Sequence, residues 1–363
     1  MVSLPPWDAI YYSAAARSIL SQVSPYIYEN FVLLVGQIDS AAKPYLWNYA
    51  PPALFWFLPL GLFEIETAAS LWRMMLILSY LIGLNVFYEI LKSEKLTKDK
   101  QLLLWFGPTV ILFPLADIMW SNCTSLVFLF YVLILRALYF QQSDIYRGIL
   151  FSLLILKPHL FIPLGVFLSI QSLMARKMSF FVGLAVGIMI QLVPVIIFVP
   201  DIFESYLASL PNILSASKTF WGISLFSSLY AIFGWTNPTR IGLFILILLG
   251  VFLFFIKKSD FEKGLYVMPV AILVAPHANV HVVVLLAPIF WYLLSQFYYH
   301  NTVRIAFLNL IMIALLAGSP FVYLYKLFEF PILILLLMIM VLAFSIVGLQ
   351  MLIKEDTGAT KCL

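Results

Sequence analysis

The sequence predicts an all-α fold, a polytopic bundle of transmembrane helices with short interfacial helices in its external loops. Hydrophobic residues make up 63% of the 363 residues and charged residues 10%, whereas soluble domains contain roughly 45–50% and 25%. Apolar runs recur along nearly the whole chain, separated by short basic connections. Because backbone polar groups inside a bilayer must be satisfied within their own segment, we expect these runs to be helical. No linker, repeat or low-complexity tract divides the chain, so residues 1–363 are expected to form one domain.

Residues 1–50 are expected to lie outside the membrane as a loop with interfacial helices, because prolines and tyrosines interrupt any apolar run there. The segment lacks basic residues followed by an apolar core of about 7–15 residues, the pattern of a signal peptide. An external segment without a signal peptide predicts that the first spanning helix lies upstream of residue 1. The alternative is a short tail that is translocated unaided.

The transmembrane bundle is expected within residues 51–353, with about eleven spans, and residues 354–363 form a cytoplasmic tail. A spanning helix needs about 20 residues, so several of the runs are too short to cross without help from neighbours. Two shorter apolar helices, 51–63 and 221–234, are expected to dip into the outer half of the membrane. The expected spans are 67–91, 101–115, 123–141, 147–157, 160–174, 179–199, 239–256, 264–276, 281–298, 303–323 and 331–353.

The distribution of basic residues predicts the orientation of the bundle. Lysines and arginines concentrate in the connections 92–100, 136–147, 176–177 and 257–263 and in the C-terminal tail. The positive-inside rule then assigns these connections to the cytoplasm. The segments 1–50, 115–122, 200–220, 276–281 and 324–330 fall outside. The two cysteines, Cys123 and Cys362, lie on opposite sides in this topology, so no disulfide is expected.

The first candidate for chemistry is Asp8. It shares one helical face with Tyr11, Tyr12 and Ala15, at the spacing i, i+3, i+4 and i+7. An external carboxylate on an interfacial helix could accept a proton from a sugar hydroxyl, which contributes about 10²- to 10⁴-fold to a rate. The alternative is structural, because aspartate is a favoured N-cap residue before an alanine-rich helix.

Further polar residues stand at the external ends of apolar runs. Tyr49 precedes Pro51 and Pro52, and proline suits the first turn of a helix. Asn122, with Asp117 nearby, flanks the external end of the span 123–141. Its Asn-Cys-Thr sequon abuts the membrane too closely for glycosylation.

Lys157 and the pair His277 and His281 complete the set. Lys157 interrupts an apolar stretch on the external side. It either snorkels to the interface or faces a lipid phosphate. His277 and His281 are four residues apart, but no third ligand is evident nearby, so we expect no metal site. Hydrogen bonding to a phosphate oxygen is the preferred interpretation.

In this order, the elements resemble the GT-C superfamily of membrane glycosyltransferases, and within it glycosyltransferase family 87, a polyprenyl-phosphomannose-dependent α-mannosyltransferase-like group. Two positions depart from the family's pattern: Trp120-Ser121 replaces a Gly-Gln before Asn122, and Ala275 replaces the serine before Pro276. The residues that carry the resemblance are Asp8, Tyr11, Tyr12, Tyr49, Pro51, Pro52, Asn122, Lys157, Pro158, Pro276 and His281.

The resemblance implies an inverting transfer of a hexose, mannose first, from a polyprenyl-phosphate donor to a lipid, glycan or protein acceptor on the extracytoplasmic face. Asp8 would be the general base, and Lys157 and His281 would stabilise the charge that grows on the phosphate. Arg73 and Lys218 are weaker candidates for that role. Tyr11, Tyr12, Trp47, Tyr49 and Asn122 would contact the substrate. Besides membrane lipids, the donor and the acceptor are the only partners that the resemblance implies, with no cofactor and no nucleic acid.

Two alternatives to an active transferase remain. The first is a transporter or flippase of a lipid-linked or amphiphilic substrate. It would place ionisable residues near the bilayer midplane and often contain paired repeats, whereas here they stand at helix ends and no repeat is evident. The second is an inactive scaffold, which would tolerate the loss of Asp8.

Overall fold

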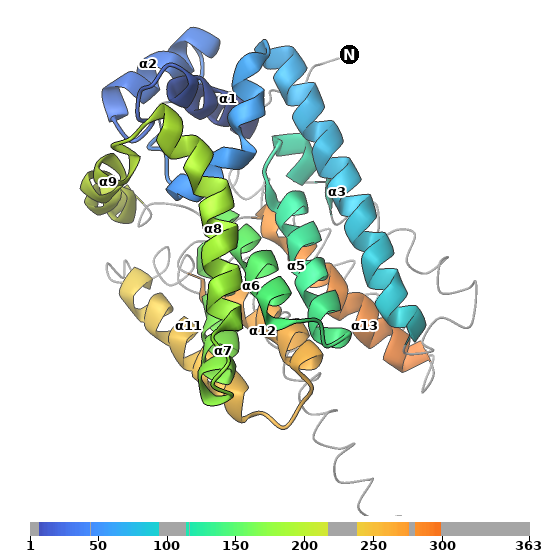
Figure 1. The fold of residues 1–363 in the computed structure, drawn as a ribbon. Coiled ribbons are helices and arrows are strands. Elements are labelled where there is room, and N and C mark those ends of the chain that lie inside the picture. Colours follow the sequence, from blue (N-terminus) through green and yellow to red (C-terminus); the bar gives the residue numbers. More distant parts are fainter. Residues whose placement is uncertain are drawn as a thin grey trace, which may run out of the picture.

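The structure is a computed structural model, and it describes residues 7–43, 45–93, 114–115, 117–216, 238–275 and 280–298. Within these residues every element is a helix (Figure 1), which confirms the predicted all-α class. The elements are α1 (Trp7–Leu20), α2 (Tyr28–Ile38), the 3₁₀ helices η1 (Pro51–Trp56) and η2 (Leu58–Leu62), α3 (Ile65–Ser93), α5 (Thr124–Tyr139), α6 (Asp144–Leu153), η3 (Leu154–Leu156), α7 (Pro158–Met174), α8 (Ser179–Phe198), α9 (Ile202–Ala216), α11 (Pro238–Phe255), α12 (Asp260–Val274), η5 (Val280–Leu286) and α13 (Ala287–Tyr298).

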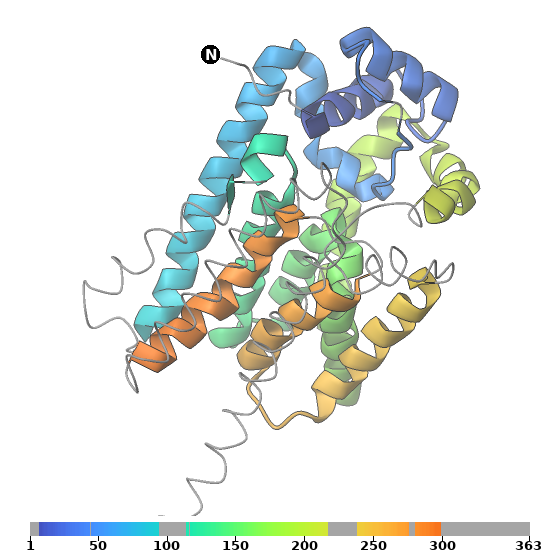
Figure 2. The same cartoon turned by 180° about the vertical axis from the view of Figure 1, so that it is seen from behind.

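The helices form an elongated bundle with a cap at one end (Figures 1 and 2). The cap consists of α1, α2, η1, η2 and α9. Helix α1 packs on α2 and η2, while η1 packs on α8 and α9. Helices α3, α5, α6, α7, α8, α11 and α12 form the bundle below the cap. The cap brings the N-terminal segment over the ends of α5 and α7, where the predicted site residues lie.

Most of the observed helices follow the predicted spans closely where both are described. The predicted spans 147–157 and 281–298 differ, because each contains a 3₁₀ helix, η3 or η5, beside its α-helix. Two of the observed helices, α3 and α8, are long and apolar enough to cross a membrane, while α5, α7 and residues 244–255 of α11 are shorter apolar helices. The predicted segments 221–234, 303–323 and 331–353 and most of 101–115 lie outside the described residues. The expected count of eleven spans is therefore not confirmed.

The segment 51–63 forms two 3₁₀ helices, η1 and η2, and not the single apolar helix that we predicted. Pro51, Pro52 and Pro59 explain the difference, since proline has no N–H for the α-helical ladder and fixes its own φ angle. Both short helices are anchored by buried side chains, among them Leu54 and Phe57. Helices α1 and α2 lie within the segment 1–50, and α9 lies within the segment 200–220.

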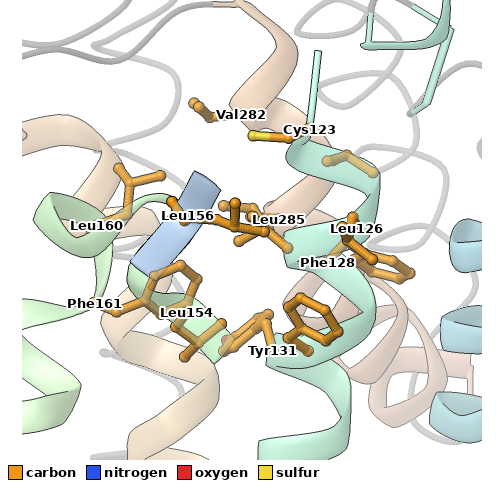
Figure 3. Close-up of a cluster of buried hydrophobic side chains, with 14 of the residues drawn as sticks. Cys123, Leu126, Phe128, Tyr131, Leu154, Leu156, Leu160, Phe161, Val282 and Leu285 are labelled. Atoms are coloured by element: carbon orange, nitrogen blue, oxygen red, sulfur yellow. The ribbon is translucent and has the colours of Figure 1, made fainter. Parts of the chain in front are cut away.

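Helix α5 is the centre of the bundle. Most of its side chains are buried, as expected of a helix that is apolar all round. Figure 3 shows Tyr131 of α5 on the side of Leu154 and Phe161, which come from the neighbouring η3 and α7. The ring of Phe128 packs instead against Tyr80 of α3. Tyr131 also donates a hydrogen bond to the carbonyl of Gly264 on α12, at 2.7 Å. The start of α5 is thus held at a fixed depth beneath the cap.

Helices α6 and α8 approach each other through glycines. Gly148 of α6 lies against the backbone of α8, and Gly183 and Gly187 of α8 lie against Ile145 and Ser152. A Gly-x-x-x-Gly pair of this kind lets two helix backbones touch, as is common inside membranes. One turn further on, the buried Gln191 donates to the carbonyl of Gly187 and accepts from the indole of Trp56 at 2.9 Å. This contact joins η1 to the bundle.

We expect Gly183→Ala to destabilise the protein. The added methyl group would collide with the carbonyl oxygen of Ile145, and overpacking of this kind costs about 1–3 kcal/mol. The measurement is thermal unfolding of the detergent-solubilised protein. Gly36→Ala is the matched control, because Gly36 is exposed on α2 with nothing near its Cβ position, and alanine is the better helix former. Equal unfolding temperatures for the two variants would contradict the packing argument.

Candidate active site

The candidate site is built around the segment 117–123, called the turn below, in which the helical residues 117–120 lead through residues 121–123 into α5. Ser121 has a φ of 59°, in the left-handed region that non-glycine residues rarely occupy. Two side chains of α3 hold it there: Trp72 Nε1 donates to the Ser121 carbonyl at 2.8 Å, and Arg73 Nε donates to Ser121 Oγ at 2.9 Å. The turn is therefore fixed to α3 on one side and continuous with α5 on the other.

Asp117 anchors the other end of the turn. Its two carboxylate oxygens accept hydrogen bonds from the backbone N–H groups of Thr124, at 3.0 Å, and Ser125, at 2.6 Å. These are donors that a helix start leaves unsatisfied. Burial raises the pKa of Asp117 to about 7, although its hydrogen bonds to Ser125 and Thr124 and the charge of Lys157 favour the ionised form. Asp117 thus fixes where α5 begins.

Asn122 connects this turn to α1. Its Nδ2 donates a hydrogen bond to Oδ2 of Asp8 at 2.5 Å, across 114 positions of sequence. Its Oδ1 accepts a hydrogen bond from the hydroxyl of Thr124 at 2.8 Å. The structure therefore brings Asp8 and Asn122 together, as their predicted roles require. The Asp8 side chain bonds Asn122, which is distant in sequence. Asp8 lies inside the first turn of α1, after Trp7, so the interpretation of Asp8 as the N-cap residue is wrong.

The surroundings of Asp8 make its carboxylate a stronger base than an ordinary aspartate. Asp8 as a residue is half-buried, but its neighbours shield the carboxyl group from water, and this desolvation raises its pKa. The hydrogen bond from Asn122 and the positive charge of Lys157 act in the opposite direction. A raised pKa increases the affinity of the carboxylate for the proton that a general base must accept.

Lys157 lies at the N-cap position of α7, ahead of Pro158. The whole residue is 8% exposed, and within the described part of the chain its ammonium has no ion pair or hydrogen bond. Its charge nevertheless lowers the pKa of both Asp8 and Asp117. Lys157 therefore acts electrostatically on both carboxyl groups of the site.

The predicted tyrosines adopt different positions. Tyr12 is 2% exposed, its ring stacks on Phe57 at a centroid distance of 4.2 Å, and its hydroxyl lies 2.9 Å from that of Tyr49. Trp47 is also buried and packs edge-on against Tyr12 and Phe57. The rings of Tyr12 and Trp47 thus pack among core residues, and the contact with the substrate that we expected of them stays a prediction. Tyr11 donates to the Lys43 carbonyl at 2.6 Å and is half-buried.

His281 lies on η5, beside the same turn. It is 4% exposed, and its ring meets that of Trp120 edge-on at a centroid distance of 5.9 Å. His277, Pro276 and Lys218 lie outside the described residues. Among the residues that are described, no group of three or more histidines, cysteines or acids could hold a metal ion.

Sequence reasoning missed two contributions to the site. Arg73, considered earlier as a phosphate ligand, donates instead to Ser121 Oγ and to the carbonyl of Met119 at 3.5 Å, so it positions the turn. Thr124 was not singled out. Its place two residues after Asn122 is the available signal, because threonine hydroxyls often bond to near neighbours at helix starts.

The raised pKa of Asp117 predicts a dependence of stability on pH. Between about pH 4, the ordinary aspartate pKa, and pH 7, the folded protein holds a proton that the unfolded chain has lost. The resulting contribution to the free energy of unfolding is fully present below the pKa of Asp117 in the unfolded chain. It disappears as the pH rises through the pKa of Asp117 in the folded protein. We expect the unfolding temperature of the solubilised protein to fall across this range and Asp117→Asn to flatten the fall. Asp201→Asn, at an exposed position, should leave the slope as it is, and an unchanged slope in Asp117→Asn would refute the assignment.

The comparisons with known proteins identify the family of the chain. The chain matches glycosyltransferase family 87 over residues 47–320, well over half of its length. This span includes Tyr49, Asn122, Lys157 and His281, while Asp8 precedes it. No curated protein and no solved structure matches the chain. The chain belongs to glycosyltransferase family 87, and the protein is therefore a glycosyltransferase.

Proposed function

We propose that the protein is a multi-pass membrane enzyme that transfers a hexose, mannose first, from a polyprenyl-phosphate donor to a lipid, glycan or protein acceptor on the extracytoplasmic face. One observation carries the proposal: the shielded carboxylate of Asp8 is bound to Asn122 and feels the charge of Lys157. A base and a cation thus stand together at the capped end of the bundle.

The proposed step is a single displacement. The acceptor hydroxyl oxygen forms a bond to the anomeric carbon as its proton passes to Asp8. The bond between that carbon and the phosphate oxygen breaks, and its electron pair leaves with polyprenyl phosphate. Attack from the face opposite the leaving group inverts the anomeric centre. The ammonium of Lys157 stabilises the negative charge that grows on the phosphate, and it does so most strongly in a site shielded from water.

The surfaces of the bundle support placement in a bilayer. Helix α8 exposes Val182, Val186, Met189 and Val193, whose spacing of four, three and four puts them on one face. Helices α3 and α11 expose further large apolar side chains. Basic residues occur at helix ends remote from the cap: Lys92 ends α3, and Arg136 in the last turn of α5 bonds Glu89 of α3 at 3.3 Å. With the positive-inside rule, the cap and Asp8 lie on the extracytoplasmic side.

A transporter is the second candidate, but the arrangement of charge favours it less. Asp8, Asp117 and Lys157 act on one another at the capped end of α5, whereas a transporter places its ionisable residues near the midplane. Family membership also favours transfer over transport.

We expect Asp8→Asn to lose sugar transfer by about 10²- to 10⁴-fold, because the amide cannot accept the acceptor's proton. Transfer of radiolabelled sugar from a polyprenyl-phosphate donor, measured in membranes, tests this directly. Glu204→Gln is the matched control, since it removes an exposed carboxylate from α9 in the same cap. Full incorporation by Asp8→Asn would remove Asp8 from its proposed role as the general base.

We expect Lys157→Met to reduce kcat/KM for the donor by about 10- to 100-fold, the loss expected for a hydrogen bond to a charged group. Lys157→Arg should retain part of the activity, because the positive charge remains. Lys43→Met, at an exposed position of the cap loop, serves as the control. Initial rates over a range of donor concentrations measure the effect, and unchanged constants in Lys157→Met would exclude Lys157 as a donor ligand.

A further inference from the structure

A chain of three polar groups runs from α5 to Asp8. The Thr124 hydroxyl donates to Asn122 Oδ1 at 2.8 Å, and Asn122 Nδ2 donates to Asp8 Oδ2 at 2.5 Å. Thr124 is fully buried, and its own N–H is bound to Asp117 at 3.0 Å. The hydroxyl that begins the chain is therefore fixed in place by the start of α5 and does not reach Asp8 itself.

The orientation of the Asn122 amide decides what Asp8 meets. The two ends of a carboxamide have nearly the same shape but opposite hydrogen-bonding character. With the NH₂ group toward Asp8, the ionised carboxylate is stabilised. With the carbonyl toward Asp8, only the protonated acid can form the bond. A general base needs the first orientation. The group that binds the carbonyl end of the Asn122 amide therefore determines whether the NH₂ end faces Asp8.

We propose that Thr124 is a positioning residue, which holds the Asn122 carbonyl through its hydroxyl and thereby presents the Asn122 NH₂ group to Asp8. This inference rests on the proposed role of Asp8 as the base. A donor on the carbonyl also polarises the amide and strengthens its N–H as a donor. Thr124 therefore acts on Asp8 through Asn122, without contact with the substrate.

Thr124→Val tests the proposal, because valine keeps the branched shape and removes the hydroxyl. We expect kcat at neutral pH to fall about tenfold, the effect of roughly one hydrogen bond, with KM for the donor unchanged. The acidic limb of the rate profile should move to higher pH, since the ionised form of Asp8 is less stabilised. Thr124→Ser restores the hydroxyl and should recover most of the native rate and the native profile.

A second readout follows the carboxyl group without substrate. The infrared band of the protonated carboxyl of Asp8, identified by its loss in Asp8→Asn, can be titrated in the reconstituted protein. We expect its midpoint to rise in Thr124→Val and to return in Thr124→Ser. Asn122→Asp approaches the chain from the other partner: it replaces the NH₂ group with an acceptor and should raise the midpoint further. It also serves if Thr124→Val does not fold.

The outcomes separate this inference from the proposed function. Native rates and midpoints in Thr124→Val would overturn it, and so would equal losses in Thr124→Val and Thr124→Ser, which indicate packing alone. Neither result would restore activity to Asp8→Asn, so the role of Asp8 would stand. If Asp8→Asn keeps full transfer, the proposed role of Asp8 as the base fails, whereas the infrared shifts still report whether Thr124 orients the amide.

Discussion

The site depends on the bond between a buried carboxylate and the start of a buried helix. Asp117 accepts the backbone N–H groups of Thr124 and Ser125, and this fixes the first turn of α5 in a region without water to compete. Asn122 and Thr124 take their positions from it. Trp72 and Arg73 hold the same turn from α3, so two helices determine where Asp8 finds its partner.

The same shielding from water acts on both carboxyl groups of the site. It raises the pKa of Asp8 and Asp117, which makes each a better proton acceptor, and the charge of Lys157 moderates both shifts. A cation placed in this way can serve the two states of the reaction: it keeps the base ionised beforehand and meets the growing negative charge of the leaving group afterwards. In the proposed mechanism, the tuning of the base and the stabilisation of the leaving group would therefore depend on one residue.

Much of the bundle could be predicted because apolar runs report directly on burial: α3, α5, α7 and α8 match the expected spans. The short helices were harder, since prolines converted 51–63 to 3₁₀ geometry. Asp8, Asn122 and Lys157 could be singled out as polar exceptions, but the Asp8–Asn122 bond joins residues 114 positions apart, and no local pattern encodes it. Tyr12 could not be placed from the sequence, because an aromatic ring suits a core as well as a sugar.

The left-handed backbone of Ser121 is held by two kinds of hydrogen bond. Trp72 donates a hydrogen bond to the main-chain carbonyl of Ser121, a group that every residue possesses. Arg73 donates to the Ser121 side-chain oxygen. Glycine or asparagine would suit this backbone at least as well as serine. Glycine would lose only the hydrogen bond from Arg73. A small or turn-forming residue at position 121 would therefore keep this backbone, while a β-branched residue there would shift the backbone amide of Asn122.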